Sequence, residues 1–193
     1  MTTRKVNRKK TALPKATGFN QVVSLDLKFH GDSTYILWAV DEATKLIRGE
    51  VIHDKTPETM TKALDYIWIT GRGLGPGIPA GRGLGPGIPE RGFFSDNGTE
   101  FLNEKFKGLL QAHGVGLRTT STFSPQQNGV NERNHGTADI LVKRIMMDDP
   151  SLTLQQAVNK AAWAKNTRVQ SIPVGILEKP YYSRVVTLSS RSF

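Results

Sequence analysis

Apolar and polar residues alternate over the first part of the chain, which is the pattern of strands in a half-buried sheet. In the strand predicted from Gln21 to Phe29, Asp26 lies on the more polar of the two sides. Residues 33–41 are almost continuously apolar, which is typical of a strand buried on both faces. Residues 44–52 predict a third strand. Because the links between these stretches are short, we expect an antiparallel meander.

Later stretches repeat apolar residues at helical spacing, with two short apolar runs between them. The first helix is predicted to begin with Thr56 as its cap and Pro57 as its first residue, and to run to about Thr70. Further helices are expected at residues 100–113, 130–147 and 153–167, and short strands at 92–94 and 115–120. The apolar stripe of the second helix is predicted to hold Leu102, Phe106, Leu109 and Leu110. This order predicts an α/β fold, with helices packed on both faces of a five-stranded mixed sheet.

Residues 71–90 interrupt this pattern. The ten-residue unit from Gly71 to Ala80 is repeated from Gly81 to Glu90, with only its last residue changed. Such a density of glycine and proline excludes a helix or a central strand. A phosphate-binding loop is one interpretation, but no Lys-Ser or Lys-Thr pair follows the glycines. A duplicated loop is favoured, because the entropy of loop closure grows slowly with length.

Composition bounds the class of protein. The chain has 193 residues and no cysteine, which suits one α/β core and excludes disulfides and a Cys/His zinc module within it. A net charge of +9 favours a polyanionic partner. Residues 1–18 are predicted to form a basic flexible arm, either a nucleic-acid or import segment or a solvated leader. We expect no membrane association and no secretion, because neither a spanning run nor the apolar core of a signal peptide is present.

Three acids stand out by position. Asp26 lies inside an apolar strand, where acids are rare, Asp96 ends a short strand, and Glu132 lies near the start of the long helix. Each has an ordinary interpretation: Asp96 precedes Asn-Gly as turn residues do, and Glu132 suits a helix dipole. Together they predict a metal-dependent site where strands end in loops.

Helical geometry assigns sides to the long helix. Ala138, Leu141, Val142 and Ile145 form its apolar stripe. A second side, clear of this stripe, holds Glu132, Gly136, Asp139 and Lys143. Glu132 is therefore expected to project across the ends of the strands.

Three segments resemble the catalytic core of retroviral and long-terminal-repeat retrotransposon integrases, most closely those of gypsy-type elements. They are Phe19–Lys28, Ser95–Phe101 and Ser124–Arg133, and the last two place 35 residues between Asp96 and Glu132, the interval of that family. The resemblance predicts a core at residues 19–170, followed by a divergent tail at residues 171–193.

The resemblance implies an RNase H-like fold and a nucleotidyltransferase with endonuclease chemistry, which processes DNA 3′ ends and transfers them into target DNA. Asp26, Asp96 and Glu132 would be the catalytic acids and would hold two Mg²⁺ (or Mn²⁺) ions. DNA contacts are expected from Asn97, Gln127, Asn128, Arg133 and Lys143. Implied partners are the element ends, target DNA and further copies of the chain, giving at least a dimer, in the nucleus or in an element-derived particle.

Some features depart from that family. Asp139 is acidic on a helix side that is basic in retroviral integrases, and His135 is expected to be packed or solvated rather than on DNA. The tail resembles no part of the family, and with the repeat it suggests a truncated or decaying element copy. The alternative is therefore an inactive or domesticated core that binds DNA or protein. A related nuclease, such as a resolvase or transposase, is disfavoured by the segment from Ser124 to Glu132.

Overall fold

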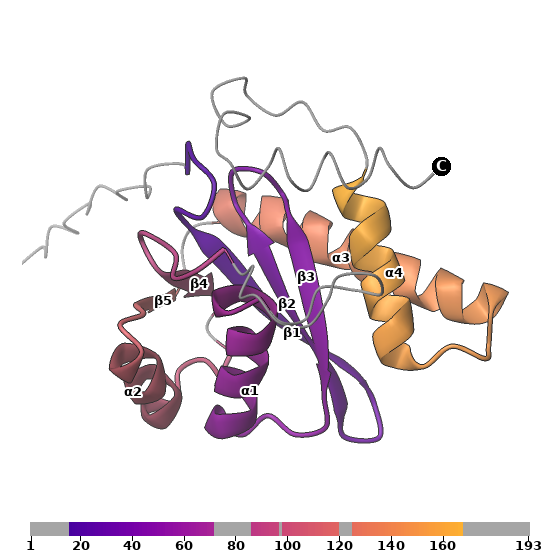
Figure 1. Cartoon of the computed structure of the whole chain (residues 1–193), viewed down its shortest axis with the longest axis horizontal. Coiled ribbons are helices and arrows are strands. Elements are labelled where there is room, and N and C mark those ends of the chain that lie inside the picture. The colour runs from indigo at the N-terminus through magenta and orange to yellow at the C-terminus, as the bar shows by residue number, and fades with distance from the viewer. Residues whose placement is uncertain (1–15, 72–85, 97, 120–124, 168–193) are drawn as a thin grey trace, which may run out of the picture.

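The computed structural model describes residues 16–71, 86–96, 98–119 and 125–167, with the backbone alone described over 125–135. Its sheet has helices on either side, α1 and α2 on one and α3 and α4 on the other (Figure 1). In chain order, the elements are β1 (Val23–Gly31), β2 (Thr34–Asp41), β3 (Ile47–Ile52), α1 (Pro57–Leu64), η1 (Asp65–Ile69), β4 (Phe93–Ser95), α2 (Glu104–Ala112), β5 (Leu117–Thr119), α3 (Pro125–Asp148) and α4 (Leu154–Asn166).

The strands of the described region form one five-stranded sheet in the order β3-β2-β1-β4-β5. The first three pair antiparallel, as short hairpin links require. β4 pairs in parallel with β1, and β5 pairs in parallel with β4, each after a helical crossover. The α/β class and the five-stranded mixed sheet predicted from the sequence are therefore confirmed.

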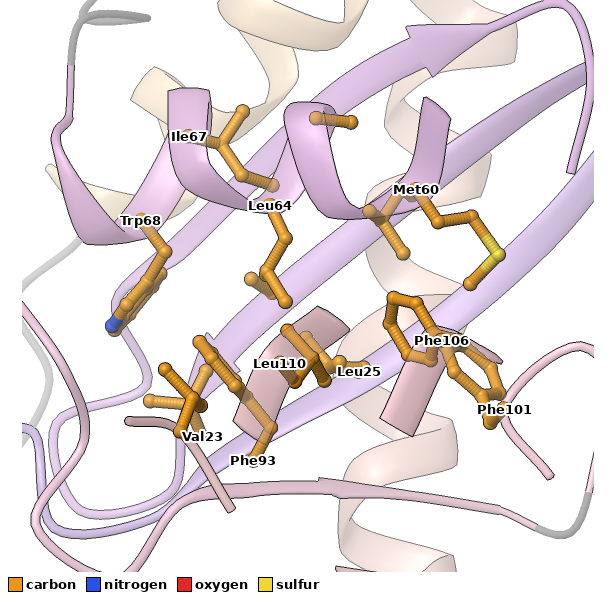
Figure 2. Packing of buried hydrophobic residues seen from close by; sticks show 14 of the residues in the cluster. Val23, Leu25, Met60, Leu64, Ile67, Trp68, Phe93, Phe101, Phe106 and Leu110 are labelled. Carbon is orange, nitrogen blue, oxygen red and sulfur yellow. The ribbon is translucent and has the colours of Figure 1, made fainter. Parts of the chain in front are cut away.

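One core lies between the sheet and the helices α1, η1 and α2. Figure 2 shows its side chains meeting between these helices and β1. Alternation along β1 sends Val23 and Leu25 into this core, and β2 adds Leu37 and Ala39. The helical members are Met60, Leu64, Ile67, Trp68, Phe106 and Leu110.

A second core lies on the opposite face of the sheet. Ile36, Trp38 and Val40 are the alternate positions of β2, so this strand is buried on both faces, as its apolar run predicts. The stripe predicted for the long helix lies here, with Ala138 and Val142 buried. The partly buried Leu141 and Ile145 pack beside them, and α4 contributes Ala157, Val158, Ala161 and Ala162.

The first helix changes type before it ends. Thr56 caps it as predicted, its side chain accepting a hydrogen bond from the backbone N–H of Thr59. After Leu64 the turns widen into the π-helix η1. The carbonyl oxygen of Ile67 accepts a hydrogen bond from Arg48 Nη1 at 2.9 Å, and the indole N–H of Trp68 donates to Asn20 at 2.9 Å. These bonds from outside the helix accompany the wider turns.

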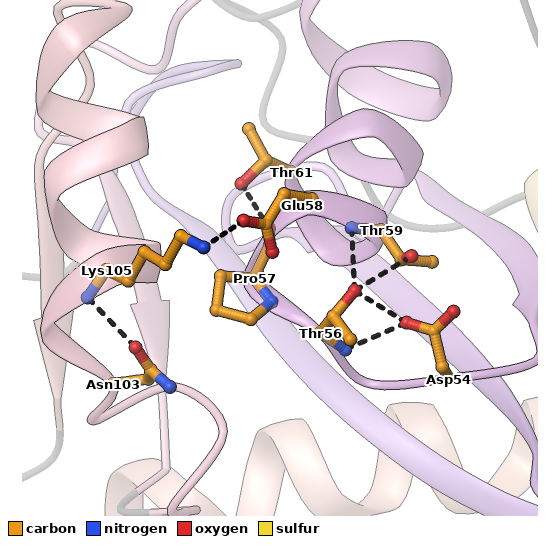
Figure 3. Close-up of polar contacts among 8 residues, drawn as sticks. All are labelled: Asp54, Thr56, Pro57, Glu58, Thr59, Thr61, Asn103 and Lys105. Carbon is orange, nitrogen blue, oxygen red and sulfur yellow. Dashed lines mark hydrogen bonds and ion pairs between the residues drawn. The ribbon is translucent and has the colours of Figure 1, made fainter.

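The second helix begins later than predicted, at Glu104 rather than residue 100. Phe101 is buried in a turn ahead of the helix, so Leu102 is 40% exposed and the prediction that it belongs to the apolar stripe is wrong. The Asn103 side chain then caps the helix by accepting from the N–H of Lys105. Figure 3 shows Lys105 reaching back to Glu58 in an ion pair that joins the start of α2 to the start of α1.

Other element boundaries also differ from prediction, most of all the starts of β3 and α3. β3 begins at Ile47 rather than residue 44, because Asp41 accepts hydrogen bonds from the backbone and side chain of Thr44 and closes a tight turn. α3 begins at Pro125, so the Asn-Gly pair at 128–129 lies within it.

In the described part of the chain, no helix combines the length and hydropathy needed to cross a membrane.

Candidate active site

Asp26 lies near the middle of β1, half-buried, on the face of the sheet that packs against α3 and α4. Its antiparallel partner on β2 is Trp38, a member of that core. Cross-strand partners point to the same side of a sheet, so register alone orients Asp26 towards α3. Burial of this carboxylate follows from its place in a central strand.

Asp96 follows directly after β4, at the carboxyl end of a strand parallel to β1. The register pairs Leu25 with Ser95, so Asp26 and Asp96 are the next positions along two neighbouring strands. On the other side of β4, Gly92 (φ 86°) allows the close approach of the segment before β5, because a Cβ there would meet the carbonyl oxygen of Gly116 at 2.3 Å. Asp96 Oδ1 accepts a hydrogen bond from the N–H of Gly98 at 3.0 Å, the turn contact expected of an Asp before Asn-Gly.

The two carboxylates share one electrostatic environment. Burial raises the pKa of Asp26, and the negative charge of Asp96 raises it further, while Lys28 opposes both effects. Two acids distant in the chain are therefore close enough to interact. A divalent cation would offset this repulsion, and carboxylate oxygens are the ligands that Mg²⁺ and Mn²⁺ prefer.

A further acid, Glu100, lies beside this pair and is not among the site residues predicted from the sequence. A Cβ added to Gly98 would lie 2.9 Å from Glu100 Oε1 and 3.1 Å from Asp96 Oδ1, so the two side chains flank the same glycine. Glu100 also contributes to the raised pKa of Asp26. The sequence predicts Glu100 in a helix that in fact begins later, although the residue lies within the segment Ser95–Phe101 that carries the family resemblance.

Asp139 on α3 contacts the sheet beside Asp26. Its Oδ1 accepts a 2.9 Å hydrogen bond from the indole N–H of Trp38, whose side chain is fully buried. This side of α3 was predicted to lie clear of the apolar stripe, yet at Asp139 it rests against the sheet. Gly49 makes room for the arrangement, because a Cβ there would meet the Trp38 ring at 2.5 Å.

Several predicted site residues lie outside the described positions. Asn97 is one of them, and Gln127, Asn128, Glu132 and Arg133 belong to the part of α3 whose backbone alone is described. Lys143 is exposed on α3. Among the described side chains, which do not include that of Glu132, no group of three or more His, Cys, Asp and Glu residues is arranged to hold a metal ion.

Part of the chain is similar in sequence to viral Gag-Pro-Pol polyproteins. No family model matches the chain. Over 72 residues, 37% of this chain, it is 31% identical to the Gag-Pro-Pol polyprotein of Human T-cell leukemia virus 2. That match spans 5% of the polyprotein, so the chain corresponds to a small part of its curated relative.

Solved structures agree with this similarity. The HTLV-2 integrase catalytic core, solved in complex with magnesium, superposes with a TM-score of 0.55 and 22% identity, covering 81% of this chain and 92% of that one. The catalytic core of BIV integrase gives a TM-score of 0.58 and 19% identity over 90% and 99% of the two chains. The chain has the RNase H-like fold of retroviral integrase catalytic cores, which confirms the predicted resemblance to them; the closer resemblance to gypsy-type elements stays a prediction.

Proposed function

We propose that this chain is an integrase-type catalytic core, a metal-dependent polynucleotidyl transferase that processes DNA 3′ ends and joins them to target DNA. The observation that carries the proposal is the meeting of Asp26 and Asp96 on neighbouring parallel strands, where burial and then the charge of Asp96 raise the pKa of Asp26. The integrase-like fold and the similarity to a retroviral polyprotein support it.

Asp26, Asp96 and Glu132 are the residues proposed to hold the metal. Glu132 lies in α3 seven positions before Asp139, which is about two helical turns, so both fall on nearly the same side of that helix. Because Asp139 contacts Trp38, the cross-strand partner of Asp26, this side of α3 faces β2 next to the first acid. Two Mg²⁺ or Mn²⁺ ions bound there would neutralise the charge that develops on a phosphate under attack.

The proposed reaction is two successive displacements at phosphorus. In the first, water attacks a phosphodiester near the DNA end, and breaking of the P–O bond leaves a free 3′ hydroxyl. In the second, this hydroxyl loses its proton and bonds to a target phosphorus, and the departing target 3′ oxygen gains a proton. No covalent bond to the protein forms, so the chain would act by positioning the DNA and by holding, with its three acids, the metal ions that neutralise the phosphate charge.

Other partners follow from exposed side chains. On α3, exposed Lys143 is proposed to contact DNA phosphates, together with Arg133, Asn97, Gln127 and Asn128. Large apolar side chains are exposed on α3 and α4, with Ile140 65%, Met147 81% and Trp163 63% accessible, which supports self-association through these helices. The HTLV-2 integrase core has been solved in trimeric and dimeric forms.

A joining assay tests the proposal. The full chain is incubated with branched DNA and Mn²⁺, beside the variant Asp96→Asn, which keeps the side-chain shape and removes the charge. We expect strand joining or its reversal from the native chain and none from the variant. Equal signals from both, or salt-sensitive DNA binding without any joining, would reject the catalytic proposal in favour of a binding module.

A further inference from the structure

The tip of the β1–β2 hairpin carries an aromatic and basic cluster that the proposed acid site does not use. Phe29 near the end of β1 is 61% exposed. Its ring lies against that of its cross-strand partner Tyr35, with centroids 5.4 Å apart and planes tilted by 55°. Lys55 Nζ stands 5.9 Å from the centre of the Tyr35 ring. We call Phe29, Tyr35 and Lys55 the hairpin patch.

The hairpin patch is more exposed than a purely structural cluster requires. A cross-strand aromatic pair stabilises a hairpin through the contact between its rings. Phe29 keeps most of its surface in solvent beyond that contact, and the Lys55 side chain is 50% exposed. An aromatic face and a cation are thus presented side by side.

Contacts between side chains connect the hairpin patch to the candidate active site. Lys55 Nζ lies 4.0 Å from Glu100 Oε2, and the carboxylates of Glu100 and Asp96 flank Gly98. On the other face of β1, Lys28 adjoins Phe29 in sequence, and its charge acts on Asp26. Through Lys55 and Glu100, the hairpin patch therefore lies next to the Asp96 side of the candidate active site.

We propose that the hairpin patch binds an unpaired nucleotide of DNA, with its base stacked on Phe29 and its phosphate paired with Lys55. The proposal deepens the proposed function and rests on it. Aromatic faces beside cations are how proteins hold single strands without reading sequence, because every base has a π-face. In a duplex the bases are stacked on one another, so an unpaired strand is the form of DNA that this surface fits. The Lys55–Glu100 contact is long enough for a phosphate to compete with it.

Binding of fluorescein-labelled oligothymidylate, followed by anisotropy without divalent metal, tests the stacking. The variant Phe29→Leu keeps an apolar side chain on the hairpin and removes the ring. We expect its Kd to rise at least about five-fold, the lower end of what one stacked base contributes. Tyr66→Leu is the matched control, since Tyr66 is 42% exposed in η1, at the far end of the helical segment that starts beside Lys55.

The salt dependence of binding tests the proposed contact between Lys55 and a phosphate. In Lys55→Gln, the slope of log K against log salt should fall by about 0.7 for a single strand, whereas Phe29→Leu should leave the slope unchanged. If Phe29→Leu binds as tightly as Tyr66→Leu, or if Lys55→Gln keeps the native slope, the inference is overturned. Should Phe29→Leu fail to show a cooperative thermal transition, Phe29→Trp decides instead, because its larger ring should tighten binding.

The two proposals fail in different ways. Oligothymidylate binding that depends on Phe29, together with no joining of branched DNA, would reject the catalytic function. Joining that Asp96→Asn abolishes, together with native oligothymidylate binding by Phe29→Leu, would reject only the hairpin patch. If the native chain does not bind oligothymidylate at all, the hairpin patch is rejected whatever the joining assay gives.

Discussion

At the scale of single residues, burial of Glu50 on β3 makes the free energy of unfolding depend on pH. It faces the α1 side of the sheet, opposite Leu37, and burial raises its pKa from 4.5 to about 7. In the unfolded chain the carboxyl loses its proton near its ordinary pKa, while the folded chain keeps the proton to higher pH. The free energy of unfolding therefore falls as pH rises from about 4.5 to about 7 and is then constant.

The variant Glu50→Gln removes this titration and should be more stable than the native chain at pH 8, with the advantage disappearing near pH 4. Urea unfolding at the two pH values measures the difference. Glu90→Gln, the same substitution at an exposed position, is the matched control. An advantage for Glu50→Gln that is equal at both pH values would contradict the prediction, because it would not come from ionisation.

At the residue scale, two acids of the candidate site could be predicted from the sequence, and a third acid beside them could not. Asp26 was selected because an acid inside an apolar strand is rare, and Asp96 because it ends a strand beside a turn signal. Glu100 was missed because its approach to Asp96 depends on the turn that buries Phe101, a tertiary contact with no local pattern.

At the scale of elements, periodicity predicted the type and order of strands and helices, and tertiary contacts set several of their ends. The start of α2 moved because a buried phenylalanine and an asparagine cap precede it. The widening of α1 into η1 accompanies bonds to Arg48 and Asn20, which lie far away in sequence. A pattern of apolar residues contains no information about such partners.

The hydrogen bond between Trp38 and Asp139 joins a helix to the sheet and gives a prediction at this scale. Asp139→Leu removes the acceptor from a buried N–H and should lower the free energy of unfolding by about 1–3 kcal/mol. Urea unfolding measures the loss. Asp139→Asn keeps a carbonyl acceptor of the same reach and should recover much of it. Native stability in Asp139→Leu would mean that the bond adds nothing to the docking of α3.

At the scale of the whole molecule, the duplicated loop is expected to be a tolerated insertion between η1 and β4. Residues 72–85 lie outside the described positions, but the end of the second copy is anchored. Asn20 Nδ2 donates to the carbonyl oxygens of Pro86 and Ile88 at 2.9 and 3.2 Å, and the N–H of Glu90 donates to the carbonyl of Asn20. These contacts hold the chain where it enters β4 and leads to Asp96.

Deleting residues 71–80 should therefore leave the fold intact and raise the free energy of unfolding slightly, by about 0.6 kcal/mol. The reason is that halving the length of a loop lowers the entropic cost of closing it by about that amount. Deleting residues 81–90 is the matched control: the two products have the same sequence except that the residue before Arg91 is glutamate in one and alanine in the other. Thermal unfolding by circular dichroism should give nearly the same cooperative transition for both. Loss of cooperativity in both products would contradict this prediction. Both products keep one complete copy of the repeat before Arg91, so the loss would have to come from the shorter loop.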